Sequence, residues 1–250
     1  MAFNATGAYN TGYIGKLHID GDARPGFVPH GWRRRGFSIM EGFNRGHAYF
    51  DGKTFTNEGK LIKVPGYEPT YQTDRAMHFM NAAASRPFFL VLSWGPPHNP
   101  FTPPEAYKRR RRTFRWSPNV PGHLQSSEAE ASLSGYLGLC ESLDHEFGRL
   151  MQFIDGSAHA ESTLVIFTAD HGDSLFSHGD SDNHKNTFFE ESWRVPLMLR
   201  FPKAWRRQRH LERSSDGRAW LQFDQPMTLA GTGINPSNLP ASQPRQQHIM

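Results

Sequence analysis

Two polar residues, Asp170 and His171, close an apolar run in the sequence Ser162-Thr-Leu-Val-Ile-Phe-Thr-Ala-Asp-His-Gly172. The apolar residues 164–167 are typical of a strand that is buried on both faces of a parallel sheet. Ligands of open α/β sheets bind beyond the carboxyl ends of the strands. A carboxylate and an imidazole there indicate a site for a metal ion or an anionic substrate, although the pair in isolation is more typical of a polar turn.

Two lysines and two further histidines accompany other strand-like segments. Lys16 and His18 are two residues apart, so both side chains would point the same way in a strand. His98 follows a second apolar run after two prolines, and Lys185 lies further along the chain. Lysine can neutralise a tetrahedral oxyanion, and histidine can donate to its oxygens or protonate a leaving group. Together these residues favour sulfate or phosphate ester chemistry over purely structural roles.

An alternation of strands and helices must position these side chains. Apolar runs predict four strands, at residues 11–18, 88–94, 164–167 and 195–201. Apolar spacings of three and four predict helices over residues 71–85 and 127–154. This alternation predicts an α/β fold.

Two long segments lack such patterns. Residues 23–66 are rich in Gly, Arg and aromatics, which predicts a long loop decorated with short strands. Residues 203–250 are rich in Arg, Gln, Ser and Pro, which predicts an irregular tail of low order.

The composition allows a sizeable core without selecting a partner. The chain has 250 residues and a formal net charge of +4, which fits an anionic substrate or a polyanion. Cys140 is the only cysteine, so no internal disulfide forms. No apolar run is long enough to span a membrane, and the first residues do not resemble a signal peptide, so the default expectation is a cytoplasmic location. The basic run at residues 108–112 is more typical of a solvated loop than of a contact to sulfated glycans or nucleic acid.

Several motifs, in this order, resemble those of the sulfatases, a family of the alkaline-phosphatase-like superfamily. Residues 12–21 resemble the family's Gly-Lys-Trp-His signature, with Leu17 in place of tryptophan. Residues 87–101 resemble its strand and Pro-His-x-Pro loop. Residues 168–172, 183–185 and 189–196 resemble the metal- and anion-binding region that lies late in the family's sequence. The resemblance covers residues 7–202 and implies a sandwich in which helices flank a mostly parallel central sheet.

The resemblance also implies roles in catalysis and substrate binding. Lys16 and Lys185 correspond to the lysines that hold the sulfate oxygens. His18 and His98 correspond to the histidines that line the pocket, one at the nucleophile region and one near the leaving group. The implied reaction is the hydrolysis of a sulfate monoester, either a small molecule or a sulfated glycan, and nucleic acid is not an expected partner.

A divalent cation is implied as well. Asp170 and His171 correspond to its ligands, and calcium is the usual metal of the family. Manganese or zinc is the alternative, because imidazole suits transition metals.

Three features of the family pattern are absent from this sequence. The family opens with a strand that ends in two metal-binding aspartates, followed by a Cys-x-Pro-x-Arg motif whose cysteine becomes the formylglycine nucleophile. Neither occurs here, and Cys140 cannot substitute, because it lies in a predicted helix without the required Pro and Arg. The family's small carboxyl-terminal sheet domain is also missing. We therefore expect a partial catalytic domain over residues 1–202, with weak metal affinity and no covalent catalysis of its own.

Two other functions stay open at this point. The complete protein could be a phosphoesterase or a phosphonate hydrolase of the same superfamily, which the imidazole of His171 favours. The chain could also be a non-catalytic fragment that binds anions or polyanions.

Overall fold

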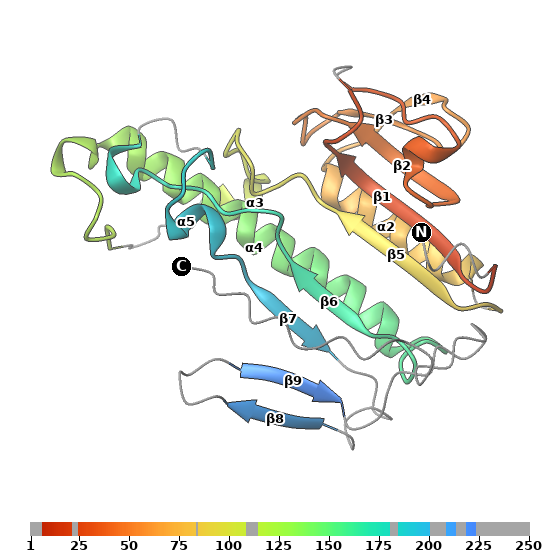
Figure 1. Cartoon of the computed structure of the whole chain (residues 1–250). Coiled ribbons are helices and arrows are strands. Elements are labelled where there is room, and N and C mark those ends of the chain that lie inside the picture. Colours follow the sequence, from red (N-terminus) through yellow and green to blue (C-terminus); the bar gives the residue numbers. More distant parts are fainter. Residues whose placement is uncertain are drawn as a thin grey trace. The chain divides into compact units, whose positions relative to one another are not determined.

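Figure 1 shows the computed structural model of the chain, which describes residues 7–21, 25–83, 85–108, 115–180, 185–200, 209–213 and 219–223. The chain divides into two compact units, Met1–Arg200 and Phe201–Met250. All six candidate site residues belong to the first unit.

In the second unit, β8 (Arg209–Arg213) and β9 (Ala219–Phe223) form an antiparallel pair. The sequence predicted little regular structure over residues 203–250, and this pair of strands departs from that prediction. The run Ala219-Trp-Leu-Gln-Phe223 holds the aromatic and aliphatic types that favour strands, but the polar composition of the whole segment obscured it.

The main sheet of the first unit is built around β1 (Asn10–Leu17). This strand pairs in parallel with β2 (Ile39–Asn44) on one side and with β5 (Phe88–Ser93) on the other. Beyond β2, the short strands β3 (Lys53–Phe55) and β4 (Leu61–Lys63) continue the sheet in antiparallel pairing, in the order β4-β3-β2-β1-β5. The expected α/β fold is confirmed, with a sheet that is mixed rather than mostly parallel.

The run that ends at Asp170 lies elsewhere. It forms β6 (Val165–Thr168), which pairs antiparallel with β7 (Leu197–Arg200) in a separate two-stranded sheet. Ile166 is 57% exposed, so the prediction of a strand buried on both faces of a parallel sheet is wrong. A β-branched run specifies extended backbone, but it does not specify which strands or helices cover it.

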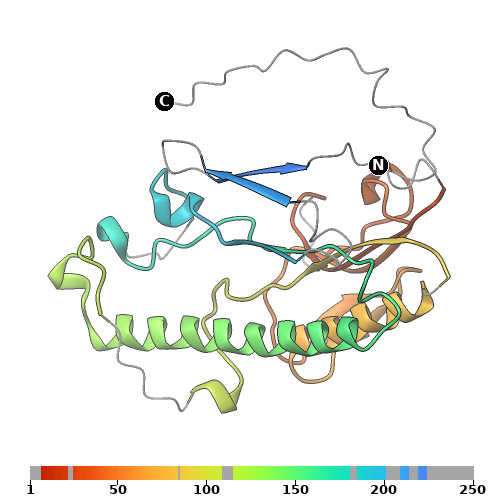
Figure 2. The same cartoon turned by 90° about the horizontal axis from the view of Figure 1, so that it is seen from below.

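Two long helices lie along the same face of β1, β5 and β6 (Figure 2). They are α2 (Glu68–Ala82) and α4 (Ser127–Asp155), close to the predicted ranges. The side chain of Ser126 caps α4 by accepting a hydrogen bond of 3.2 Å from the backbone of Ala129. Acidic residues in the first turn of α4 complement the positive end of its dipole.

The core lies between these helices and β1. Its buried residues are Ile14, Ala76, Phe79, Met80, Leu150 and Ile154. Val165 of β6 packs against the same cluster, and the rings of Phe147 and Phe167 lie 5.2 Å apart. Helix α4 therefore packs against the main sheet and against β6 of the two-stranded sheet.

Short helical turns complete the unit. They are η1 (Trp32–Arg34), α3 (Glu105–Lys108), η2 (Gly122–Leu124), η3 (Ser177–Gly179) and α5 (Glu190–Trp193). Among the described residues, none of the helices is both long and apolar enough to cross a membrane.

Candidate functional site

Three polar side chains converge where the parallel strands of the main sheet end. Lys16 lies near the end of β1, His47 follows β2, and His98 follows β5. The Lys16 Nζ is 3.5 Å from the His47 Nε2, and the His47 ring stacks on His98 with centroids 3.8 Å apart. Adjacent parallel strands bring their carboxyl ends to one edge, which explains the convergence. We call Lys16, His47 and His98 the amino-terminal half-site.

Close strand packing fixes the position of Lys16. Gly15 has a φ of +112°, and a Cβ atom there would lie 2.0 Å from the carbonyl oxygen of Ser93. A Cβ atom at Gly42 would lie 2.0 Å from the carbonyl oxygen of Gly15. The Lys16 carbonyl accepts hydrogen bonds from Tyr13 Oη at 2.6 Å and from Ser93 Oγ at 2.8 Å. The backbone that carries Lys16 is therefore held by both neighbouring strands.

Burial shapes the charge of this half-site. Desolvation, reinforced by the nearby Lys185, lowers the pKa of Lys16 to about 8. Desolvation and Lys16 lower the pKa of His47 to about 3, and desolvation lowers the pKa of His98 to about 4. At pH 7 both imidazoles are neutral, while most Lys16 side chains still carry a charge.

A buried carboxylate, that of Glu68, lies close to the amino-terminal half-site. Glu68 is the first residue of α2 and only 2% exposed, and desolvation raises its pKa to about 7. Its Oε1 atom has no hydrogen-bond partner among the described residues. The charge of Glu68 acts on both Lys16 and Tyr49, whose hydroxyl donates to the carbonyl of His98.

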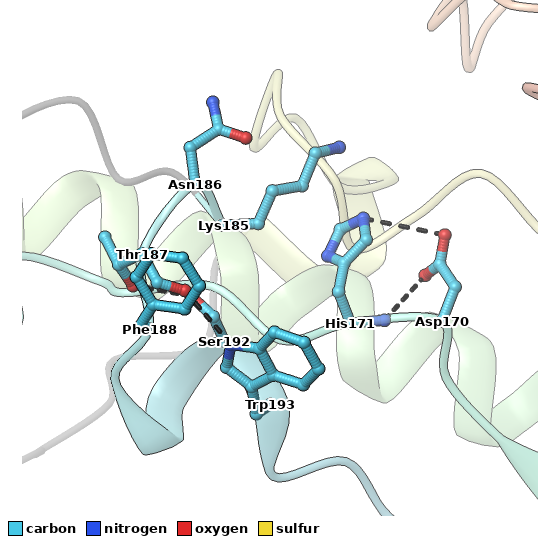
Figure 3. Close-up of a pocket in the computed structure, with 8 residues that line it drawn as sticks. All are labelled: Asp170, His171, Lys185, Asn186, Thr187, Phe188, Ser192 and Trp193. Carbon is cyan, nitrogen blue, oxygen red and sulfur yellow. Dashed lines mark hydrogen bonds and ion pairs between the residues drawn. The ribbon is translucent and has the colours of Figure 1, made fainter.

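Asp170, His171 and Lys185 form what we call the carboxyl-terminal half-site. The backbone N–H of His171 donates to Asp170 Oδ1 at 3.0 Å, and the His171 Nε2 is 3.5 Å from Asp170 Oδ2 (Figure 3). The His171 Nδ1 donates to the carbonyl of Gly172 at 2.9 Å. The Asp170 side chain is 88% exposed. His171 and Lys185 are half-buried, as are the three residues of the amino-terminal half-site, so Asp170 is the exposed member of the group.

The two half-sites meet. The rings of His98 and His171 lie 6.4 Å apart, and the charges of Lys185 and Asp170 both act on Lys16. Five of the six residues singled out from the sequence are therefore brought together.

His18 lies next to the end of β1. The strand was predicted to reach His18, and in the structure it ends one residue earlier, at Leu17, with His18 exposed. Its charge still lowers the pKa of His47, which places it near the rim of the amino-terminal half-site.

His47 and Glu68 were not predicted from the sequence. His47 follows a strand, as His98 does, but that strand lies within the segment predicted to be a decorated loop. The basic run at residues 108–112 lies outside the described residues except for Lys108, which pairs with Glu105 at 3.4 Å.

The donors present do not complete a metal site. Within the part of the chain that the structure describes, no group of three or more His, Cys, Asp or Glu side chains could hold a metal ion. Calcium takes six to eight oxygen ligands, and Asp170 supplies at most two. Asp170 and His171 alone therefore do not fit a calcium ion.

Comparisons with known proteins agree with this arrangement. The profile of the Sulfatase family matches residues 3–232. An ulvan-active sulfatase from Formosa agariphila is 30% identical over 206 residues, which is 80% of this chain and 40% of that protein. The structure of a putative sulfatase, yidJ, from Bacteroides fragilis covers 80% of this chain and 48% of its own, with a TM-score of 0.72 and 24% identity.

The fold is also shared outside the sulfatases. A phosphonate monoester hydrolase from Silicibacter pomeroyi covers 80% of this chain and 51% of its own length, with a TM-score of 0.55 and 18% identity. The chain thus spans about half or less of the proteins it matches. Because the family profile covers most of its length, and lysines and histidines converge at the strand ends, the chain belongs to the sulfatase family.

Proposed function

We propose that the two half-sites together bind the sulfate group of a sulfate monoester, as part of a hydrolase of such esters. The observation that carries this proposal is the meeting of Lys16, His98 and Lys185 from distant parts of the chain. Sulfate esters are anions with tetrahedrally arranged oxygens, which charged lysines and imidazole N–H groups bind well. Membership of the sulfatase family supports the same substrate class, as a small ester or a sulfated glycan.

Each side chain has a proposed role. Lys16 and Lys185 hold the sulfate oxygens, and a bound anion stabilises the charged form of Lys16 that burial disfavours. His98 and His18 act on the reacting groups, His98 from within the half-buried site and His18 from its rim. Residues 1–202 form the partial catalytic domain that carries these groups.

A divalent cation, with calcium the first candidate and manganese or zinc the alternatives, would need ligands beyond Asp170 and His171. The 250-residue sequence contains no Cys-x-Pro-x-Arg motif that could yield a formylglycine nucleophile. We therefore propose that this chain by itself binds sulfate esters without turning them over.

Binding of inorganic sulfate, measured by calorimetry, tests the anion site. We expect Lys16→Ala to weaken binding about tenfold or more, because a charge-assisted hydrogen bond contributes about 1.5–3 kcal/mol. Lys63→Ala is the matched control. Lys63 lies on β4, is exposed and pairs with Asp51, so its loss should change binding less than about twofold. Equal effects of the two substitutions would contradict the proposal.

Turnover of 4-nitrophenyl sulfate tests the second part. The unsubstituted chain should show no more activity than a variant that combines Lys16→Ala with His98→Ala. Activity that those changes abolish would show that the chain is catalytic by itself.

A phosphoesterase or phosphonate hydrolase is the second candidate, favoured by the imidazole of His171, which suits zinc or manganese. Competition between phenyl sulfate and phenyl phosphate for the site discriminates between the two. A strong preference for phenyl phosphate would reverse the ranking.

A further inference from the structure

A pocket opens beside the carboxyl-terminal half-site, and aromatic rings line part of it. Its volume is about 410 Å³, within the range of small-molecule sites. The lining residues are Asp170, His171, Lys185, Asn186, Thr187, Phe188, Ser192 and Trp193. Figure 3 shows the Trp193 ring between Phe188 and His171, with Lys185 on the other side of the pocket. Cationic and aromatic groups thus face a single cavity.

The aromatic rings of this pocket are unusually exposed. Trp193 is 70% exposed and Phe188 is 96% exposed. Full burial of a large aromatic side chain stabilises a folded protein by about 1.5–3 kcal/mol. Because these two rings stay exposed, most of that stabilisation is absent here. Exposed tryptophans beside a cavity are typical of residues that bind a partner.

The indole is nevertheless held in place. Its Nε1 donates to the carbonyl of Thr187 at 3.2 Å, and the hydroxyls of Thr187 and Ser192 are hydrogen-bonded at 2.8 Å. The backbone N–H of Gly172 donates to the carbonyl of Ser192 at 2.9 Å, which ties α5 to the loop that carries His171. A preorganised ring loses little entropy when it binds a ligand.

We propose that Trp193, flanked by Phe188, is a platform for the sugar ring of a sulfated carbohydrate; this inference rests on the anion site proposed above. One face of a pyranose ring presents C–H groups, whose partial positive charge is attracted by the negative face of an indole. The hydroxyls at the ring edge meet polar partners, because Asn186, Thr187 and Ser192 line the same pocket.

The polar lining favours a sugar over an aryl group. An aryl sulfate would also stack on Trp193, but it offers no groups for the amide and hydroxyls at the edge of the platform. The sulfate of the bound sugar would lie against Lys185, which lines the pocket and is close enough to Lys16 to lower its pKa. The proposal therefore divides the ligand between an aromatic platform for the ring and cations for the ester.

Ligand-observed saturation-transfer NMR tests this division. The probes are galactose 6-sulfate and glucose 6-sulfate, their unsulfated parent sugars, and inorganic sulfate measured by calorimetry. We expect the strongest transfer at protons on one face of the sugar ring, and Trp193→Ala to weaken sugar sulfate binding about tenfold. Inorganic sulfate binding should change less than about twofold, and Trp193→Phe should retain most of the sugar affinity.

Trp32→Ala is the matched control, because Trp32 is 74% exposed in the same unit and is not among the residues that line the pocket. It should leave binding of all probes unchanged. The platform proposal is overturned if Trp193→Ala leaves sugar sulfate binding intact, weakens inorganic sulfate equally, or if neither sugar sulfate binds.

The two proposals fail in different ways. If the anion site is wrong but the platform exists, sulfation adds nothing to affinity and the unsulfated sugars still depend on Trp193. If the platform is wrong but the anion site exists, all sulfated probes bind through Lys16 and none depends on Trp193.

Discussion

The two half-sites differ in how the fold supports them. The amino-terminal half-site stands on a strand held by parallel partners on both sides, and its lysine and imidazoles are partly desolvated. The carboxyl-terminal half-site stands on the two-stranded ribbon of β6 and β7, and its carboxylate is almost fully exposed. Burial lowers the pKa values of Lys16, His47 and His98 in the first half-site. In the second, solvent screens the charge of the exposed Asp170. Chemistry that needs low dielectric therefore belongs to the first, and access for a large ligand belongs to the second.

The largest effect is expected where strands pack against glycine. Gly15→Ala should lower the free energy of unfolding by about 4 kcal/mol or more, since the new Cβ would overlap backbone in a strand with positive φ. Gly148→Ala, in the carboxyl-terminal part of α4 with open space around it, should raise that free energy by up to about 1 kcal/mol. Urea unfolding measures both, and a Gly15→Ala variant of normal stability would show that the strands are not closely packed.

Substitution of one isoleucine in β1 and one in β6 compares how deeply the two strands are buried. Ile14 of β1 is buried in the core, so Ile14→Ala should cost about 3 kcal/mol. Ile166 of β6 is largely exposed, so Ile166→Ala should cost less than about 1 kcal/mol. Equal losses in urea unfolding would mean that β6 is buried in solution by something that the described residues do not include.

Glu68 gives the amino-terminal half-site a pH signature. Its folded pKa is raised from 4.5 to about 7, so the folded state binds more protons across that window and the free energy of unfolding falls as pH rises. Glu68→Gln should remove this fall and be about 2 kcal/mol more stable than the unsubstituted chain at pH 8. The lowered pKa of His47 makes the free energy of unfolding rise with pH between about pH 3 and 6.5. This contribution is the same in the Glu68→Gln variant and in the unsubstituted chain, so it cancels in the comparison.

The measurement is thermal or urea unfolding from pH 4 to pH 8, with exposed Glu130→Gln as the control. A pH profile that Glu68→Gln leaves unchanged would argue that water or another cation already stabilises the buried carboxylate.

The smallest effect concerns calcium. We expect about 1 mM calcium to raise the free energy of unfolding by less than about 0.5 kcal/mol, since Asp170 and His171 supply too few ligands. Calorimetry with Asp170→Asn checks this expectation. Micromolar binding that the substitution abolishes would show that the carboxyl-terminal half-site does hold a metal ion.

The sequence predicted the local elements well. The ranges expected for two helices and for the strands at β1, β5, β6 and β7 agree with the structure to within a few residues. Local periodicity and β-branched runs carry that information. Lys16 and His98 were both predicted at strand ends, and the structure brings each of them to His47, because the ends of parallel strands share an edge.

Tertiary pairing was harder to read. The apolar run of β6 gave no sign that its partner would be antiparallel or that one face would be exposed. His47 escaped notice because β2 is short and lies in a Gly- and Arg-rich segment. Glu68 looked like an ordinary acidic residue at a helix start, and only the fold reveals that it is buried.

Helix α4 has a further consequence. It contains 29 residues and is about 43 Å long, and it contacts the core below Lys16 as well as the underside of β6. No ladder of hydrogen bonds joins the main sheet to the β6–β7 pair within the described residues, so the packing of this helix against both contributes to the spacing between the half-sites. A bend near Phe147 would work as a hinge, changing how far apart the lysines stand without touching either of them.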